Sequence, residues 1–179
     1  MAIIKELDEN RRSVLDVARL MMVAARTAPK GKGVNNIEMM ILTDNDLGNL
    51  AGVMRKIGEQ NDAGIFIRDS ENILNSAEAL VLIGTRVKSL GVKVCGMCGF
   101  SNCDAKQENP AVPCVFNTGD LGVAAGSAVA IAADHRIDCR IMYTAGLAAL
   151  NMQIMSKDMR IIWGIPLSVS SKNPFFDRK

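Results

Sequence analysis

Hydrophobic residues recur every three or four positions from Leu7 to Ala28, and this spacing predicts one long helix. Three further apolar side chains widen the hydrophobic face enough to predict burial on more than one side: Leu15, Leu20 and Met22. The helix should end at Pro29, because the residue before a proline is pushed out of the helical region. The glycines of the following KGKG do not continue a helix either.

Apolar runs farther along the chain predict four strands. They cover residues 37–43, 79–86, 139–145 and 160–166. The run at 79–86, ALVLIGTR, is typical of a strand that is buried on both faces of a sheet.

Segments of helical character separate these strands, at 44–61, about 70–77, 118–133 and about 145–155. We expect Asp44 or Asn45 to cap the first of them and Thr118 to cap the third. Asp120 would then lie in the first turn of the third helix, where a negative charge is favoured. The alternation of strands and helices favours a layered α/β or α+β domain with helices packed on a central sheet.

The segment 87–116 has little periodicity and holds four of the five cysteines. An irregular segment of this length inside a compact domain is usually functional or disordered, and the cysteines favour function. We therefore predict a single domain over residues 1–179, with 87–116 as a cysteine-rich insertion.

The composition restricts the class of protein. A chain of 179 residues with 49% hydrophobic and 22% charged residues is typical of one soluble globular domain. The net charge of +2 gives no reason to expect nucleic acid or a membrane as the partner. The longest uncharged apolar stretch, residues 121–133, is shorter than the roughly 20 residues of a spanning helix and predicts a buried one. No export signal is visible at the N-terminus, so we expect a cytoplasmic protein with reduced thiols.

The run CGMCGFSNC places Cys95, Cys98 and Cys103 within nine residues, and Cys114 follows. A disulfide framework is disfavoured by the odd number of cysteines and the absent export signal. Zinc remains an alternative, although structural zinc sites tend to show two short cysteine pairs rather than this uneven spacing. The glycines after the first two cysteines favour an iron–sulfur cluster, because a wide cluster needs a closely wrapped loop with positive φ angles. Cys139 lies apart, in an apolar run, and is interpreted as a buried, inert thiol.

The same run resembles the C-G-x-C-G-x3-C segment of small 4Fe-4S domains in electron-transport ferredoxin subunits and corrinoid iron–sulfur proteins. The resemblance implies that its three cysteines bind a 4Fe-4S cluster. Cys114 would be the fourth ligand, although it stands closer to Cys103 than the fourth ligand does in those domains.

The rest of the chain resembles the nitroreductase-like flavoproteins. The similarity lies in an Arg-x-Ser motif at Arg11 and Ser13, a long helix ending in APK, and the later segments GDLGVAAGSAVA and WGIP. The chain as a whole is similar to the ferredoxin-domain proteins named for a domain of unknown function, which combine this frame with the CGxCG segment. The resemblance implies an α+β fold with three layers, in which helices surround a central mixed or antiparallel sheet.

It also implies a homodimer with FMN at the interface. Phosphate contacts would come from Arg11, Ser13, Lys172 and Arg178, and residues bordering the flavin ring would be Pro29, Lys30 and Asn36. Gly146 would allow the backbone to approach the ring. The basic residues also have an ordinary interpretation, since Lys30 and Lys32 can complement the negative end of the first helix.

The leading hypothesis is a cytoplasmic redox protein that relays electrons between a 4Fe-4S cluster, FMN and a redox partner protein or small-molecule electron acceptor. The alternative is a non-catalytic, zinc-stabilised module on a flavin-like frame. A flavin reductase with a purely structural cluster is a third interpretation. No proton-transfer residue stands out, which favours electron relay over hydrolysis.

Overall fold

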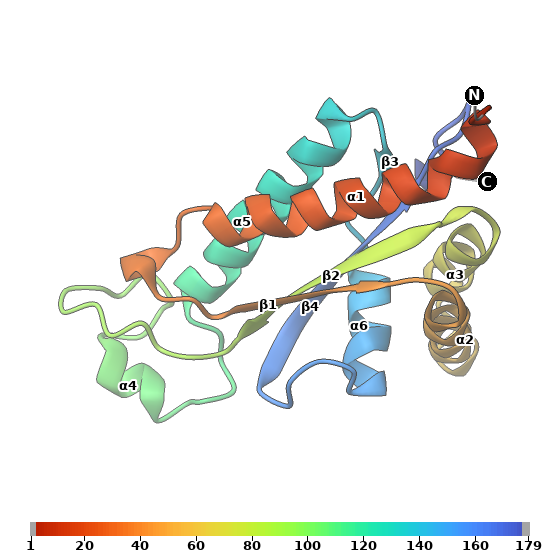
Figure 1. Ribbon diagram of the computed structural model, residues 1–179. Coiled ribbons are helices and arrows are strands. Elements are labelled where there is room, and N and C mark those ends of the chain that lie inside the picture. Colours follow the sequence, from red (N-terminus) through yellow and green to blue (C-terminus); the bar gives the residue numbers. More distant parts are fainter. Residues whose placement is uncertain (1–2, 177–179) are drawn as a thin grey trace.

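In the computed structural model, which describes residues 3–176, a four-stranded antiparallel sheet lies between two layers of helices (Figure 1). The strand order is β1-β2-β4-β3, so β2 and β4 occupy the centre. The strands are β1 (Ile37–Leu42), β2 (Ala79–Arg86), β3 (Asp138–Cys139) and β4 (Met159–Ser168).

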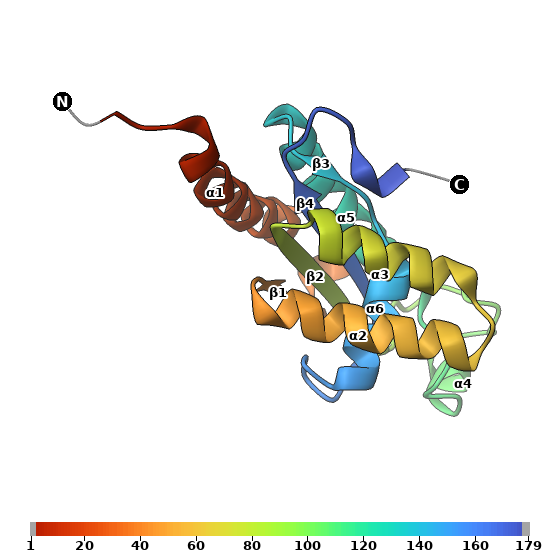
Figure 2. The same cartoon turned by 90° about the vertical axis from the view of Figure 1, so that its right-hand side faces the viewer.

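Helices α1 (Glu6–Thr27) and α5 (Val115–Asp134) pack together on one face of the sheet. Helices α2 (Asn45–Gln60), α3 (Gly64–Ser76) and α6 (Tyr143–Met152) cover the other face (Figure 2). The remaining elements are short: η1 (Gly31–Gly33), α4 (Cys103–Gln107) and η2 (Pro174–Phe176). The predicted three-layer arrangement of helices around a central sheet is confirmed, and the sheet is antiparallel throughout.

Side chains of β2 alternate between two cores, as the pleat of a strand requires. Val81 and Ile83 pack into the core beneath α1 and α5, whereas Leu80 and Leu82 pack into the core beneath α2, α3 and α6. All four are fully buried, which confirms that β2 is covered on both faces.

Helix α5 contains the predicted buried stretch, and five of its apolar residues are fully buried: Leu121, Ala124, Ala125, Ala128 and Ala132. Within residues 3–176 it is also the one helix that is long and apolar enough to cross a membrane, judged by length and composition alone. A core helix passes the same test, and α5 packs against α1 and β2.

The predicted strand at 139–145 is wrong over most of its length. Only Asp138 and Cys139 pair with β4, followed by a single bridge between Met142 and Gly164, and α6 begins at Tyr143. The apolar run at this point belongs to the start of a buried helix, which periodicity alone does not distinguish from a buried strand.

Two predicted helix starts also differ from the structure. Helix α3 begins at Gly64, ahead of the expected 70–77, and α5 begins at Val115 with Cys114 at its N-cap. Thr118 therefore lies inside α5, where its hydroxyl donates to the Val115 carbonyl. Asp120 lies beyond the first turn and instead accepts a hydrogen bond from the Gly31 N–H at 3.0 Å.

Candidate metal centre and cofactor surface

The cysteine segment leaves the sheet at the end of β2 and returns to the frame at the start of α5, with α4 inside it (Figure 1). Its two ends meet through one hydrogen bond, from the Lys88 N–H to Asn117 Oδ1 at 2.9 Å. The Lys32 ammonium contacts the carbonyls of Leu90 and Gly91 at 3.5 and 3.3 Å. The segment therefore lies beside η1, at the C-terminal end of α1.

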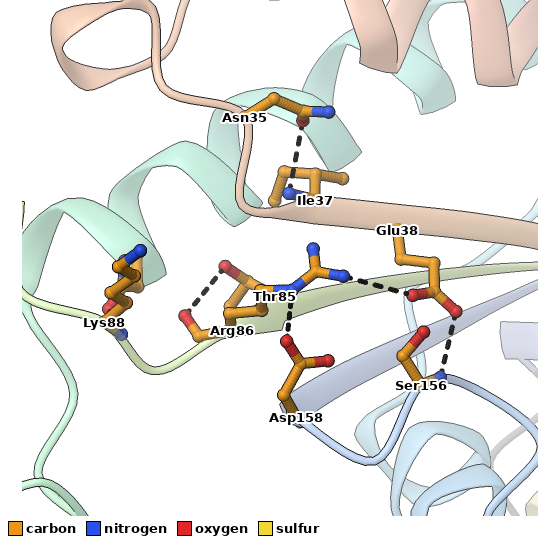
Figure 3. Close-up of polar contacts among 9 residues, drawn as sticks. Asn35, Ile37, Glu38, Thr85, Arg86, Lys88, Ser156 and Asp158 are labelled. Carbon is orange, nitrogen blue, oxygen red and sulfur yellow. Dashed lines mark hydrogen bonds and ion pairs between the residues drawn. The ribbon is translucent and has the colours of Figure 1, made fainter.

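A polar network fixes the strand end from which this segment departs (Figure 3). The Arg86 guanidinium lies between Glu38 of β1 and Asp158, which it contacts at 3.6 and 2.5 Å. Glu38 also accepts from the Ser156 N–H at 3.0 Å. The Arg86 N–H donates to the Asn36 carbonyl at 3.1 Å, so Asn36 lies next to the base of the cysteine segment.

Cys95 directly precedes a tight turn over residues 96–99, and Cys98 lies within that turn. The Gly99 N–H donates to the Gly96 carbonyl at 3.0 Å, and Gly99 has a φ of +88°. The expected positive φ is thus present at Gly99, whereas at Gly96 the backbone is ordinary, and an added Cβ would lie 3.2 Å from the Phe100 carbonyl oxygen. The two thiols are partly exposed.

Cys103 is the first residue of α4, and its thiol lies 3.6 Å from the Val92 carbonyl oxygen. Cys114 is buried at the N-cap of α5, where its sulfur accepts from the Asn117 backbone N–H. Asn117 Oδ1 accepts in return from the Cys114 N–H at 3.3 Å. The N-terminus of a long helix favours negative charge, so this position suits a thiolate.

All five thiols are free, and Cys139 lies in β3, away from the other four. Burial, and secondly the neighbouring Asp138 carboxylate, raise the pKa of the Cys139 thiol. Within residues 3–176, no three His, Cys, Asp or Glu side chains form a metal-binding group. The assignment of the other four cysteines as ligands therefore stays a proposal.

Buried polar groups without partners lie at both ends of the cysteine segment. Among the described residues only three buried side-chain polar atoms lack a hydrogen-bond partner, and two of them are Ser89 Oγ and Asn117 Nδ2. An amide N–H₂ group is a donor, and a buried donor without an acceptor is costly. An unused hydroxyl and an unused amide donor therefore lie at the two ends of the segment that carries the four thiols.

The N-terminal end of α1 borders a cleft of about 760 Å³ between α1, α2 and α3, lined by Arg11 together with Asp44 and Glu78. The Arg11 guanidinium forms an ion pair with Asp44, the residue before α2. Hydrogen bonding to Arg11 lowers the pKa of Asp44, and the same bond raises the pKa of Arg11. Asp44 thus occupies the N-cap position of α2 as expected, but its side chain binds Arg11 instead of capping the helix.

The residues expected to border a flavin ring lie at the other end of α1. The Lys30 ammonium donates to the carbonyls of Ala25, Arg26 and Ala28 at 2.9, 2.9 and 2.7 Å. Burial lowers the pKa of Lys30. The ordinary interpretation of this lysine, as a cap for the negative end of α1, is therefore confirmed, while exposed Pro29 and buried Asn36 lie nearby in the chain.

The remaining flavin contacts implied by the resemblance are spread over the molecule. Ser13 and Lys172 are exposed, and Figure 2 shows the segment after β4 apart from the first turns of α1. Arg178 lies outside the described residues. Gly146 is buried in α6, and the close approach that requires glycine there is to the backbone of β4 at Ile162 and Trp163.

The sequence did not predict the partners of three polar residues, although it predicted Asp44 as a candidate cap. Asp44, Arg86 and Asn117 acquire their roles from partners far away in the chain. For Asn117 a local signal exists, since it stands three residues after the N-cap cysteine, the spacing of a capping box.

A family model described as "uncharacterized protein containing a ferredoxin domain" (DUF2148) matches residues 110–178. An uncharacterized protein of Archaeoglobus fulgidus is 39% identical over 184 residues, which cover 98% of this chain and 97% of that protein. The chain belongs to this family. The part matched by the family model includes Cys114 but not Cys95, Cys98 or Cys103, so the ferredoxin-domain family is established without assigning these three as ligands.

Solved structures confirm the nitroreductase-like fold of this ferredoxin-domain protein. A putative nitroreductase in complex with FMN from Desulfovibrio desulfuricans has a TM-score of 0.60 at 13% identity, covering 92% of this chain and 78% of that one. A BluB-like flavoprotein from Clostridium difficile 630 has a TM-score of 0.57 at 16% identity, covering 96% and 84%. At these identities the likeness shows the fold alone.

Proposed function

We propose that this protein is an iron–sulfur redox protein in which Cys95, Cys98, Cys103 and Cys114 bind one 4Fe-4S cluster. The observation that carries the proposal is the cysteine segment itself: four free thiols on one loop, bordered by buried polar groups that lack partners. Membership of a ferredoxin-domain family supports it. When bound, such a cluster supplies one-electron oxidation and reduction.

The residues of the segment have distinct parts in this proposal. The turn at Gly96–Gly99 fixes the backbone that carries Cys98 and follows Cys95, and α4 begins at Cys103. Cys114 joins the segment to the rigid frame, because it is buried at the start of α5 and hydrogen-bonded to Asn117. The contacts at Arg86 and Lys88 fix the other end of the segment.

The test is to isolate the protein without oxygen and to record iron and zinc content together with visible and electron paramagnetic resonance spectra. Cys98→Ser should lose iron and colour. The matched control is Cys139→Ser, which removes a thiol outside the segment and should retain both. Zinc without iron at the four cysteines would overturn the electron-transfer proposal and favour a zinc-stabilised module.

We further propose that a homodimer binds FMN, with each flavin shared between two chains. Arg11 and Thr27 are 16 residues apart in α1, which is about 24 Å at 1.5 Å per residue. One FMN that contacts Arg11 with its phosphate and Pro29 and Asn36 with its ring would have to extend along most of this span, and we propose instead that the two sets of contacts come from different chains. The α1 surface also exposes apolar side chains suited to a second copy, with Leu20 46% and Val23 60% exposed.

In this proposal the cysteine segment lies next to the ring end of the flavin site. Lys32 and Asn36 contact the base of the segment directly. We therefore propose that single electrons pass between the cluster and FMN, and onward to a redox partner protein or a small-molecule electron acceptor. The setting proposed for this chemistry is the cytoplasm, where thiols stay reduced.

The dimer and the flavin are tested together. Sedimentation should give twice the monomer mass, and FMN should bind with quenching of its fluorescence. Leu20→Asp and Val23→Asp should each weaken both properties, because they place a charge in the proposed interface. The control is Asp62→Asn, on the exposed turn after α2, which should leave both unchanged. Tight FMN binding to a strictly monomeric wild-type protein would contradict the shared site.

A further inference from the structure

A cavity of about 410 Å³ lies where the loop after α6 leads into the start of β4. Much of its lining is apolar, with side chains from Leu150, Met155, Met159 and Ile162. Small-molecule sites in proteins typically have volumes of about 300–1,000 Å³ and a mainly apolar lining with a few polar groups. The volume and the lining therefore fit a small organic molecule.

The charged residues that line this cavity are both cationic. They are Lys157 and Arg160, and no Asp or Glu lines the cavity. Both residues are exposed, and neither takes part in an ion pair among the described residues. An arginine presents a fork of donors that matches a carboxylate, and a lysine adds a second positive charge. The lining therefore favours a ligand with a negative charge.

Two acidic residues beside the cavity are already engaged by Arg86. Asp158 belongs to the loop itself, and Glu38 accepts from the N–H of Ser156, which lines the cavity. The Arg86 guanidinium contacts Glu38 and Asp158 at 3.6 and 2.5 Å (Figure 3). Their negative charges are compensated within this network, so the two cations of the lining leave the cavity positive.

The lining also favours an aromatic ring. Met155 and Met159 contribute two sulfur atoms, and methionine sulfur makes favourable contacts with aromatic rings. A smaller hollow of about 160 Å³ adjoins the cavity, since the two have lining residues in common. Tyr143 and Trp163, the only Tyr and the only Trp of the chain, line this hollow.

Helix α6 ends beside the cavity at a residue with an uncommon backbone conformation. Gln153 lines the cavity and has a φ of +53° and a ψ of +36°, the left-handed region that favours glycine. The chain thus has a glutamine where a glycine would fit the backbone better. Its amide can donate a hydrogen bond to an anion.

We infer that this cavity binds an aromatic carboxylate, with its negative charge at Lys157 and Arg160 and its ring against the apolar part of the lining. The inference goes beyond the proposed redox function, because it rests on neither the cluster nor FMN. Ser156 lines the cavity and also binds Glu38 of the Arg86 network. The ligand therefore lies beside the base of the cysteine segment.

The experiment is a calorimetric titration of the full chain with cinnamate, beside cinnamamide and inorganic phosphate. Cinnamate should bind at one site per chain. Cinnamamide lacks the charge and phosphate lacks the ring, so each should bind at least about tenfold more weakly. Equal affinities for cinnamate and cinnamamide, or no binding of cinnamate, would overturn the inference.

Two variants test the cations. Lys157→Gln and Arg160→Gln should each weaken cinnamate binding about tenfold, because each removes a charge-assisted contact. The matched control is Lys56→Gln, which removes the same charge from an exposed lysine of α2 and should leave the affinity unchanged. Wild-type affinity in both cavity variants would show that the two cations hold no ligand.

Nuclear magnetic resonance of labelled methionine methyl groups tests the location. Of the eleven methionines, Met155 and Met159 should shift when cinnamate binds, whereas Met21, buried beneath α1 and α5, should not. FMN should not displace the cinnamate, because the flavin contacts proposed at Arg11 and Pro29 lie elsewhere. Displacement by FMN, or shifts confined to methionines outside the cavity, would contradict a separate site.

Discussion

Replacing Gly146 with alanine should destabilise the protein whether or not a flavin is bound. An alanine Cβ at this position would lie 2.9 Å from the Trp163 nitrogen and closer still to the Ile162 carbonyl. These atoms belong to the backbone of β4, which is held between β2 and β3 and has little freedom to move. The overlap cannot be relieved by a side-chain rotation, so α6 or β4 must shift.

The size of this effect can be bounded. Overpacking in a core costs typically 1–3 kcal/mol, and contact with a central strand belongs at about the upper end of this range. Alanine in place of glycine inside a helix recovers roughly 0.5–1 kcal/mol. The free energy of unfolding should therefore fall by about 2 kcal/mol, or roughly 4–8 °C in Tm for a chain of this length.

The assay is thermal and urea unfolding of the flavin-free protein, beside Gly126→Ala as the matched control. Gly126 lies in α5 with no atom within 4 Å of an added Cβ, so this variant should gain roughly 0.5–1 kcal/mol from its lower unfolded-state entropy. Equal stability of Gly146→Ala and Gly126→Ala would contradict a backbone clash at Gly146. Unchanged stability with lost FMN binding would show that the glycine serves the flavin, as the family resemblance implies.

Three further outcomes are expected. Asp44→Asn should tighten FMN binding in a fluorescence titration, because the phosphate no longer competes with the Asp44 carboxylate for Arg11; weaker binding would contradict this. Thr144→Val removes the buried hydroxyl that donates to Asp69 at 2.7 Å and should cost about 1–3 kcal/mol in urea unfolding, although Arg68 still pairs with Asp69. Burial raises the pKa of Cys139 above 9.0, so above that pH the unfolded state loses the thiol proton first and stability falls. The Tm difference between wild type and Cys139→Ala should accordingly decrease from about pH 8 to about pH 10, and a constant difference would argue against a raised pKa.

Elements with long and regular hydrophobic patterns could be predicted from the sequence alone. Helix α1 and strands β1, β2 and β4 lie where periodicity predicts them. The reason is that the spacing of apolar residues follows the number of buried faces of a helix or strand. The irregular cysteine segment could also be recognised in the sequence, because its apolar residues follow neither helical nor strand periodicity. The family resemblance carried in short motifs then led to the three-layer fold.

The partners of the polar groups, in contrast, depend on tertiary packing. Arg11 pairs with Asp44, and Gly31 donates to Asp120, 89 residues away in the chain. The buried Nδ2 of Asn117, which has no acceptor among the described residues, is likewise invisible in its neighbours along the sequence. The physical reason is that apolar burial follows local periodicity, whereas the partner of a charge or hydrogen-bond donor is set by how distant segments pack. The sequence thus indicated the cysteine segment, and the packing decided which polar groups lie beside it.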